Sequence, residues 1–344
     1  MAKAITSDAS TLYIQMGLLL VVAALIAGAL QLQRKFSNDQ VFLVLHKCCT
    51  YILAFFLLKY GFDKLFHFQF YPPEPNTLFT PIGSLTKDIL FWSTMGSSNS
   101  YNTFMGLIEV LPGFMLLWKR TRLLAALIGL GVLINVFALN IGFDITVKLL
   151  SLYLVLLTLF VLIPWAHVLI NIYFQNGENE GENNQLDLEI KPFTKRVLKG
   201  GIVLLFILEL ITPYADAGSF SGVDYSKIPY FGSYELANPE IGFMGDTTLR
   251  RIHIHSKGYL ITESINGTFT DYPIRTSSLD KKIFFKDLEL ILSIKHLKNH
   301  ITFSWSDMGE IKRLLVQKID LDKLPLRNDS THWTVDGLMN SSKE

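Results

Sequence analysis

Long apolar runs separated by short polar connectors dominate the first two thirds of the chain. A helix needs about 20 consecutive apolar residues to cross a bilayer, and each run is near that length. We therefore expect about six transmembrane helices, at residues 12–32, 41–62, 103–118, 123–143, 145–165 and 197–213. The first run is longer than the apolar core of a signal peptide, so a retained helix is expected rather than a cleaved one.

The pattern changes after about residue 214. Apolar residues alternate with polar ones at Leu292 and Ile294, and again at Ile301, Phe303 and Trp305, which is the period of a strand. Turn signals recur between these segments, at 256–258, 266–267 and 306–309. The C-terminal part is therefore expected to be an antiparallel β sandwich or barrel.

These patterns divide the chain into five parts. An N-terminal transmembrane helix and cytoplasmic loop are followed by a helical membrane core with a long extracytoplasmic loop at 63–100. A polar stretch rich in Asn, Gly and Glu then reads as a flexible linker, before a sixth helix and a β-rich domain. The predicted bounds are 1–40, 41–174, 175–196, 197–213 and 214–344.

Composition supports a membrane protein and excludes some other classes. The chain of 344 residues is 50% hydrophobic and only 18% charged, which is more apolar than usual for a soluble protein. A net charge of +1 with no basic stripe gives no sign of nucleic-acid binding. The two cysteines, Cys48 and Cys49, are adjacent, which is rare for a disulfide pair, and are expected to pack as small apolar residues.

Basic residues predict the orientation. Arg34 and Lys35, the cluster 119–122 and the cluster 191–199 lie in alternate connectors. All three can be cytoplasmic only if the N-terminus is outside. The expected location is the cytoplasmic membrane of a bacterium, with the loop 63–100 and the β-rich domain in the periplasm.

Ionisable and polar residues within the apolar runs form the candidate site. Such groups are costly in a membrane and usually face the interior of a helix bundle. With the predicted orientation they gather in the outer half of the membrane: Lys59, Asp63, Lys64, Glu109, Asn140, Asp144 and Lys148. The i, i+4 spacing predicts two ion pairs, Lys59 with Asp63 and Asp144 with Lys148, which could equally be purely structural.

Metal and cofactor sites have weaker support. His46 and His167 would both lie near the inner side and could in principle ligate haem, but their spacing is unconstrained, so interfacial histidine is the favoured interpretation. His253 and His255 share one strand face, yet a zinc site needs further ligands, and no metal site is predicted. The sequence contains no phosphate-binding loop, dinucleotide fingerprint or hydrolase motif.

Several ordered motifs of the helical part are similar to those of the DoxX-type membrane proteins, in the longer form met in Bacteroidetes-like bacteria. The shared elements are a G-x-x-K motif, an E-x-x-x-G helix with a basic end, and an N…D-x-x-VKL-x-S segment. Here they are Gly61–Lys64, Glu109–Gly113 with 119–122, and Asn140–Ser151. The resemblance covers residues 41–174 and implies a four-helix core made by the second to fifth spans.

The resemblance also carries expectations about function. Some DoxX-type relatives are small subunits of thiosulfate:quinone oxidoreductase, and others associate with redox enzymes. By that likeness this chain is expected to be an accessory subunit of a membrane redox system that binds a quinone or another lipid-like ligand. Nothing in the sequence identifies a cofactor, and whether the chain is itself catalytic stays open.

Two other functions fit the same sequence. The chain can be a non-enzymatic membrane scaffold or an envelope assembly factor that acts through its exported β-domain on other envelope proteins. A small-molecule transporter is the third possibility, although the sequence has no visible inverted repeat of the kind common in transporters.

Overall fold

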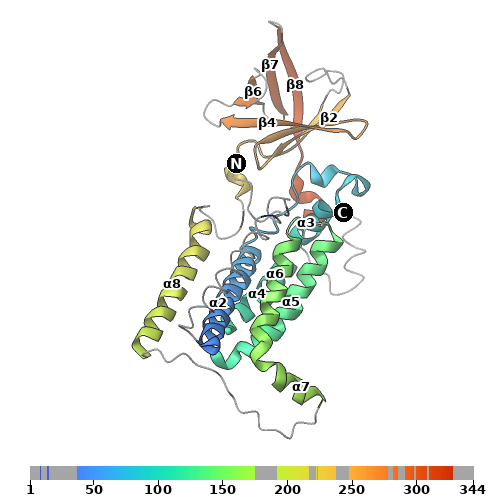
Figure 1. Ribbon diagram of the computed structural model, residues 1–344. Coiled ribbons are helices and arrows are strands. Elements are labelled where there is room, and N and C mark those ends of the chain that lie inside the picture. Colours follow the sequence, from blue (N-terminus) through green and yellow to red (C-terminus); the bar gives the residue numbers. More distant parts are fainter. Residues whose placement is uncertain are drawn as a thin grey trace. The chain divides into compact units, whose positions relative to one another are not determined.

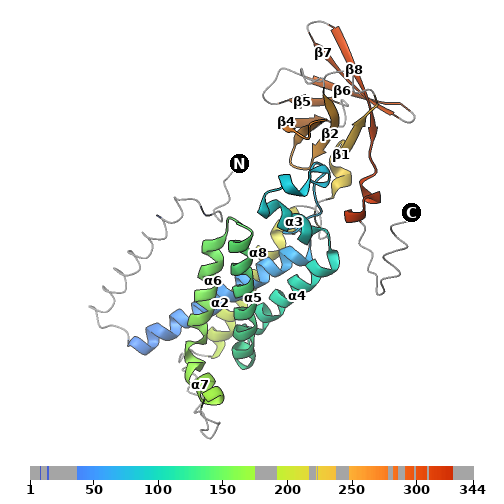
Figure 2. The same cartoon turned by 90° about the vertical axis from the view of Figure 1, so that its right-hand side faces the viewer.

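A computed structural model describes the chain at residues 8, 14, 37–174, 192–216, 222, 224–237, 248–277, 282–285, 291–297, 300–307 and 310–327. These residues form two compact units. The first combines residues 1–69 with 100–220 and is helical, and the second combines 70–99 with 221–344 and contains a β-barrel (Figures 1 and 2). Each unit is described by itself below.

The helical unit contains six α-helices in its described residues: α2 (Asn38–Leu65), α4 (Asn99–Met115), α5 (Arg122–Gly142), α6 (Lys148–Leu162), α7 (Ala166–Phe174) and α8 (Pro192–Asp216). Ser37 begins α2 with a capping box, because its hydroxyl accepts from the Gln40 amide while the Gln40 side chain accepts from the Ser37 amide. The predicted spans 41–62, 103–118, 123–143 and 145–165 correspond closely to α2, α4, α5 and α6.

The composition of these helices fits a membrane protein. In the part of the chain that the structure describes, three helical stretches are long and apolar enough to cross a membrane: Asn38–Leu65, Lys119–Gly142 and Lys148–Ile170. Their shared core contains Leu53, Leu133 and Val161, all fully or almost fully buried. Large apolar side chains such as Leu124 and Leu156 are also exposed on the outside of the helices, where a lipid environment would solvate them.

Helices α2 and α4 approach each other closely through glycines. A Cβ atom added at Gly106 would lie 2.8 Å from the Gly61 carbonyl oxygen and 2.9 Å from the Leu65 amide nitrogen. Gly113 faces Leu58 in the same way, one to two turns further along α4. Small residues at helix crossings let two backbones pack tightly, and such packing is one of the forces that associate helices in lipid.

The second unit is built on a closed antiparallel barrel in which each strand pairs with the next and β8 pairs with β1. Its strands are β1 (Gly232–Leu236), β2 (Leu249–His255), β3 (Tyr259–Ser264), β4 (Phe269–Ser277), β5 (Lys282–Phe285), β6 (Ile291–Leu297), β7 (His300–Asp307) and β8 (Glu310–Lys318). Of the two β architectures expected from the sequence, the structure is the barrel.

Alternation along the strands fills the barrel with apolar side chains. Ile252, Leu292, Phe303 and Leu314 are completely buried and belong to one core cluster. A barrel of eight strands is about wide enough for its own side chains to fill. The alternating positions identified in the sequence on β6 and β7 are confirmed as inward-facing, and the turns at 256–258 and 266–267 join β2 to β3 and β3 to β4.

A segment from the long loop between α2 and α4 belongs to the barrel unit. It contains two short 3₁₀ turns, Thr77–Phe79 and Ile82–Ser84, and the helix α3 (Lys87–Gly96). We call residues 71–80 the strap, because they lie across the outer face of β1, β2 and β3. The predicted first span at 12–32, apart from Ile14, lies outside the described residues. Of the predicted linker 175–196, residues 175–191 also lie outside them, whereas 192–196 form the start of α8, which begins five residues before the predicted sixth span.

The glycine contacts predict that Gly106→Ala destabilises the helical unit. The added methyl group would meet backbone atoms of α2 that cannot move aside, and overpacking of this kind costs about 1–3 kcal/mol. The matched control is Gly131→Ala, because nothing lies within 4 Å of a Cβ at Gly131 in α5. Thermal unfolding of the purified protein in detergent should show a lower Tm for Gly106→Ala only, and equal Tm values would refute the close packing.

Candidate functional site

A buried ion pair joins α2 to α4. The Lys64 ammonium donates to the Glu109 carboxylate at 2.7 Å, and the two side chains are only 5% and 3% exposed. Lys64 lies in the last turn of α2, and its ammonium also lies over the Tyr60 ring, 5.9 Å from the centroid. The sequence predicted that Lys64 and Glu109 share a polar site, and the structure brings them into direct contact.

A second ion pair lies beside the first on α2. Lys59 contacts Asp63 at 2.8 Å, as the i, i+4 spacing predicted. The Tyr214 hydroxyl of α8 donates to the same Asp63 carboxylate at 2.8 Å, and Lys59 lies over the Tyr214 ring. Tyr214 is almost fully buried and was not among the predicted site residues. Its position at the end of the last apolar run was the signal that could have identified it.

The remaining candidate residues lie where α5 connects to α6. The Asn140 amide donates to the Ser151 hydroxyl at 3.0 Å, and Lys148 pairs with Asp144 at 2.8 Å, as predicted. The Asp144 side chain is 81% exposed. The Asp8 carboxylate accepts from the backbone amides of Lys148 and Leu149 and thus caps the start of α6. The seven predicted residues therefore lie at two places, one on α2 and α4 and one at this connection.

His46 does not lie open to a ligand. Its Nε2 atom is 2.9 Å from the Val161 carbonyl oxygen, and its ring is buried among Phe42, Phe160 and Trp165. His167 lies exposed on α7. Among the residues that the structure describes, no group of three His, Cys, Asp or Glu side chains could hold a metal ion.

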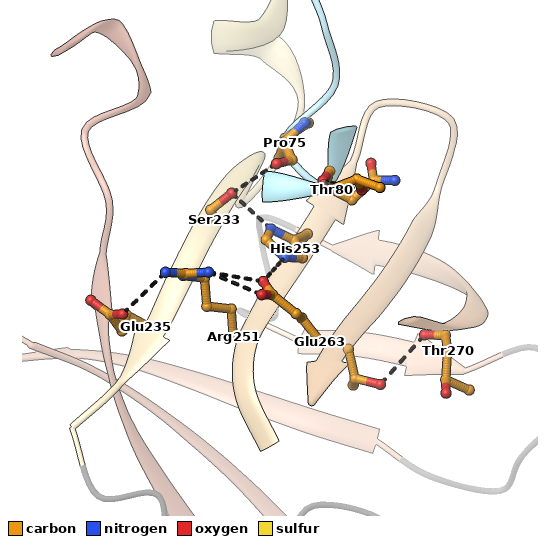
Figure 3. A network of polar contacts seen from close by, with 10 residues as sticks. Pro75, Thr80, Ser233, Glu235, Arg251, His253, Glu263 and Thr270 are labelled. Carbon is orange, nitrogen blue, oxygen red and sulfur yellow. Dashed lines mark hydrogen bonds and ion pairs between the residues drawn. The ribbon is translucent and has the colours of Figure 1, made fainter. Parts of the chain in front are cut away.

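The barrel unit holds a second polar cluster that the sequence analysis did not assemble (Figure 3). On the outer face of β1 to β3, Ser233 lies 2.8 Å from Nδ1 of His253, and Nε2 of the same ring lies 3.1 Å from Glu263. Arg251 donates two hydrogen bonds to Glu263, at 3.0 and 3.2 Å. Arg251 also lies 3.6 Å from the Glu235 carboxylate.

The strap covers this cluster. The Phe79 ring stacks on His253 with a centroid separation of 5.5 Å, and the Arg251 guanidinium lies 4.5 Å from the centroid of the same Phe79 ring. The Ser233 hydroxyl lies 3.4 Å from the Pro75 carbonyl oxygen. Consequently Ser233 and His253 are completely buried, although they lie on the outside of the barrel.

Glu74 fixes the other end of the strap. Its carboxylate accepts from both the backbone amide and the hydroxyl of Ser256, in the turn between β2 and β3. The same carboxylate lies 3.7 Å from Nδ1 of His255. Lys257 in this turn contacts the Tyr71 ring and hydroxyl. The strap is therefore held to the barrel by polar contacts at one end and by Phe79 at the other.

The charge states of the cluster follow from burial and hydrogen bonding. Burial lowers the pKa of His253 below its usual range, and the Glu263 carboxylate offsets only part of that effect. Burial alone would raise the pKa of Glu263, but hydrogen bonds from His253 and Arg251 and the charge of Arg251 outweigh it and lower the pKa. At neutral pH His253 is therefore neutral, with Nε2–H donating to ionised Glu263 and Nδ1 accepting from Ser233.

This order of hydroxyl, imidazole and carboxylate resembles the donor chain of a serine hydrolase, but the environment differs. A nucleophile must reach its substrate, whereas Ser233 is completely buried and lies against Pro75. The observed geometry is that of a buried network that joins three strands and the strap. Part of it could have been read from the sequence, because the turn at 256–258 sets a hairpin register in which Arg251 lies opposite Glu263.

Comparison with known proteins gives one informative result. The chain is similar to a Bacillus subtilis (strain 168) protein described as "Uncharacterized protein YwoB", with 33% identity over 110 residues. That match covers 32% of this chain and 70% of the relative. The chain matches no family model, and no solved structure matches it.

The buried pair on α2 and α4 predicts an asymmetric response to mutation. Lys64→Met leaves the Glu109 carboxylate buried without its cation, and breaking a buried pair in this way costs about 3–5 kcal/mol. Lys64→Met combined with Glu109→Leu removes both charges and should recover most of that loss. Thermal unfolding in detergent is the measurement, with Glu209→Leu on the exposed side of α8 as control. A single variant as stable as the wild type would contradict the pairing.

Proposed function

This chain belongs to the same family as YwoB of Bacillus subtilis, and we propose that it is an integral membrane accessory subunit of a redox system that binds a quinone or another lipid-like ligand. The observation that supports this most is the Lys64–Glu109 pair, which lies buried among otherwise apolar helices. Lys59, Asp63 and Tyr214 add further polar groups nearby, since Tyr214 and Lys59 both contact Asp63.

The stability of the helical unit does not by itself explain why a buried ion pair is present at Lys64 and Glu109. Replacing a buried ion pair by well-packed apolar residues is often neutral or stabilising, so packing alone does not require Lys64 and Glu109. The Lys64 ammonium donates to the Glu109 carboxylate at 2.7 Å and to the Tyr60 backbone carbonyl at 3.5 Å. A quinone carbonyl needs one or two hydrogen-bond donors in an apolar surrounding, and the Lys64 ammonium would supply one by giving up the longer of these two contacts.

The proposed topology has six transmembrane helices. They are the run at 12–32 together with α2, α4, α5, α6 and α8, and α2, α4, α5 and α6 form the four-helix core that the likeness to DoxX-type proteins implies. The basic clusters at 34–35, 119–122 and 191–199 face the cytoplasm. The N-terminus, the loop 63–100 and the barrel then lie in the periplasm of a bacterium, and the polar site opens toward that side.

The proposed partners follow from the same reasoning. Membrane lipids surround the exposed apolar faces of the helices, and redox-enzyme subunits associate with the chain, as they do with some DoxX-type proteins. The chain itself would hold and position the ligand, while the electron-transfer groups would belong to its partners.

Mass spectrometry of an organic extract tests the proposal. The protein is purified in mild detergent from its native membranes, and the extract is compared with that of Glu109→Gln, which removes the charge while keeping the shape. The wild type should retain a quinone or another defined lipid-like molecule in near-equal molar amount, and Glu109→Gln should lose most of it. An absorbance spectrum recorded first would reveal any haem.

The matched control is Glu209→Gln, which makes the same chemical change on an exposed face of α8. It should retain the ligand at the wild-type level. Bulk phospholipid alone in the wild-type extract, or equal ligand content in wild type and Glu109→Gln, would count against a ligand site at the buried pair.

The barrel supports a second candidate function, as a membrane scaffold or envelope assembly factor. Its interior is filled by packed side chains such as Tyr234 and Phe303, so a working surface would have to be on its outside. Removing residues 221–344 in cells discriminates the two functions. If the resulting phenotype is absent from Glu109→Gln cells, the scaffold function is favoured over ligand binding.

A further inference from the structure

Both histidines of β2 lie at the contact between the barrel and the strap. His253 is completely buried under Phe79, and His255 lies beside Glu74 at the other end of the strap. The backbone amide of Lys257 donates to Nδ1 of His255 at 3.0 Å, so this ring nitrogen acts as an acceptor, which requires the neutral form of the ring.

Charged groups surround both rings. Glu263 on β3 and Arg251 on β2 act on His253, and Glu235 on β1 neighbours Arg251. Glu74 of the strap, Lys257 in the turn and Asp271 on β4 act on His255. A protonated His253 would place two cations, His253 and Arg251, against the single buried Glu263 carboxylate.

We propose that the strap is an acid-sensitive latch, which holds the outer face of β1 to β3 while His253 and His255 are neutral and detaches when they become protonated. Phe79 of the strap covers the His253 ring, and Glu74 of the strap lies beside the His255 ring. When it detaches, the rings are hydrated and an imidazolium is no longer confined beside Arg251 or Lys257. Protons therefore bind more strongly to the detached state than to the latched state.

The direction of the pH effect can be worked out from this difference. Burial is the main cause that lowers the pKa of His253 and of His255 in the latched state. In the detached state both would titrate near the ordinary histidine value of about 6.5. A group whose pKa is depressed in one state stabilises that state at pH values above its ordinary pKa. This stabilisation is lost as the pH falls below the ordinary pKa. The latch is therefore strongest above neutral pH and weakens on acidification.

The size of the effect follows from the same linkage. Between about pH 7.5 and about pH 5.5, each histidine that titrates only in the detached state lowers the ratio of latched to detached protein by about 10-fold. Two such histidines give up to about 100-fold. The Glu74 and Asp271 carboxylates favour protonated His255, so His255 changes the ratio of latched to detached protein less. His253 is therefore expected to account for more of the pH effect.

Hydrogen exchange with mass spectrometry can measure this on the full chain in detergent. The Ser256 amide reports directly on the latch, because it donates to the Glu74 carboxylate of the strap. The Phe79 and Thr80 amides report on the strap itself, because both donate to the Asn76 carbonyl. Exchange rates are corrected for the intrinsic effect of pH and expressed as protection factors.

In the wild type, the protection factors of these amides should fall by about 10-fold or more across this pH interval, while those of β7 stay constant. His253→Gln combined with His255→Gln should make them nearly independent of pH. Since a change at the buried His253 can impair folding, His255→Gln alone is measured as well. This single variant should remove only the smaller part of the pH dependence of the protection factors. His167→Gln, an exposed histidine on α7, is the control and should behave as the wild type.

Two results would overturn the proposal. One is protection that stays constant in the wild type from about pH 7.5 to about pH 5.5. The other is an equal loss of protection in the wild type and in the double histidine variant. Phe79→Ala shows that the assay detects a detached strap, because it should lower protection at every pH. This test is independent of the ligand site, since neither Lys64 nor Glu109 is changed.

Discussion

A buried charge needs a partner, and this requirement organises both units of the protein. In the helical unit, Lys64 and Glu109 come from different helices, so their 2.7 Å contact fixes how α2 and α4 are rotated against each other. In the barrel unit, Arg251 and His253 share the Glu263 carboxylate across two strands. In each case the cost of leaving one group unpaired exceeds the modest net gain of the pair itself, so the geometry tolerates little change.

The two clusters nevertheless differ in their surroundings and in the roles proposed for them. The pair on α2 and α4 lies among helices with the composition of membrane spans, and in the proposed function its ammonium group binds the polar part of an apolar molecule. In the cluster on β1 to β3, the strap closes over Ser233 and His253, which are completely buried. The proposed role of this cluster is to respond to pH. A neutral His253 ring completes the hydrogen-bond network, whereas a protonated His253 ring would disturb it.

Much of the fold was predictable from the sequence, because hydrophobic periodicity is a local property. The apolar runs gave α2, α4, α5 and α6 within a few residues, and the alternation at Ile301, Phe303 and Trp305 gave the inward face of β7. The i, i+4 ion pairs on α2 and at the start of α6 were equally local. Closure of the barrel was not predictable, since pairing of β1 with β8 joins strands about 80 residues apart.

In the candidate sites, too, local contacts were predictable and contacts between distant parts of the chain were not. That Lys64 and Glu109 belong together could be inferred, but Tyr214 and Asp8 reach their partners from distant parts of the chain and could not be placed. The covered cluster was missed because Ser233, Glu263 and the strap residue Phe79 are unremarkable one by one. Only the register of three strands and the path of a loop, which belongs to the helical part of the sequence, bring them together.

Closure between β1 and β8 has a consequence for the life of the polypeptide in the cell. A closed barrel presents no unpaired strand edge, and an unpaired edge is the usual starting point for aggregation. A chain cut or terminated before β8 would leave two such edges at once, along β1 and along β7. Synthesis of the last strand thus converts an aggregation-prone open sheet into a closed barrel. The barrel has no unpaired edge only when residues 310–318 have been made and have paired with β1 and β7.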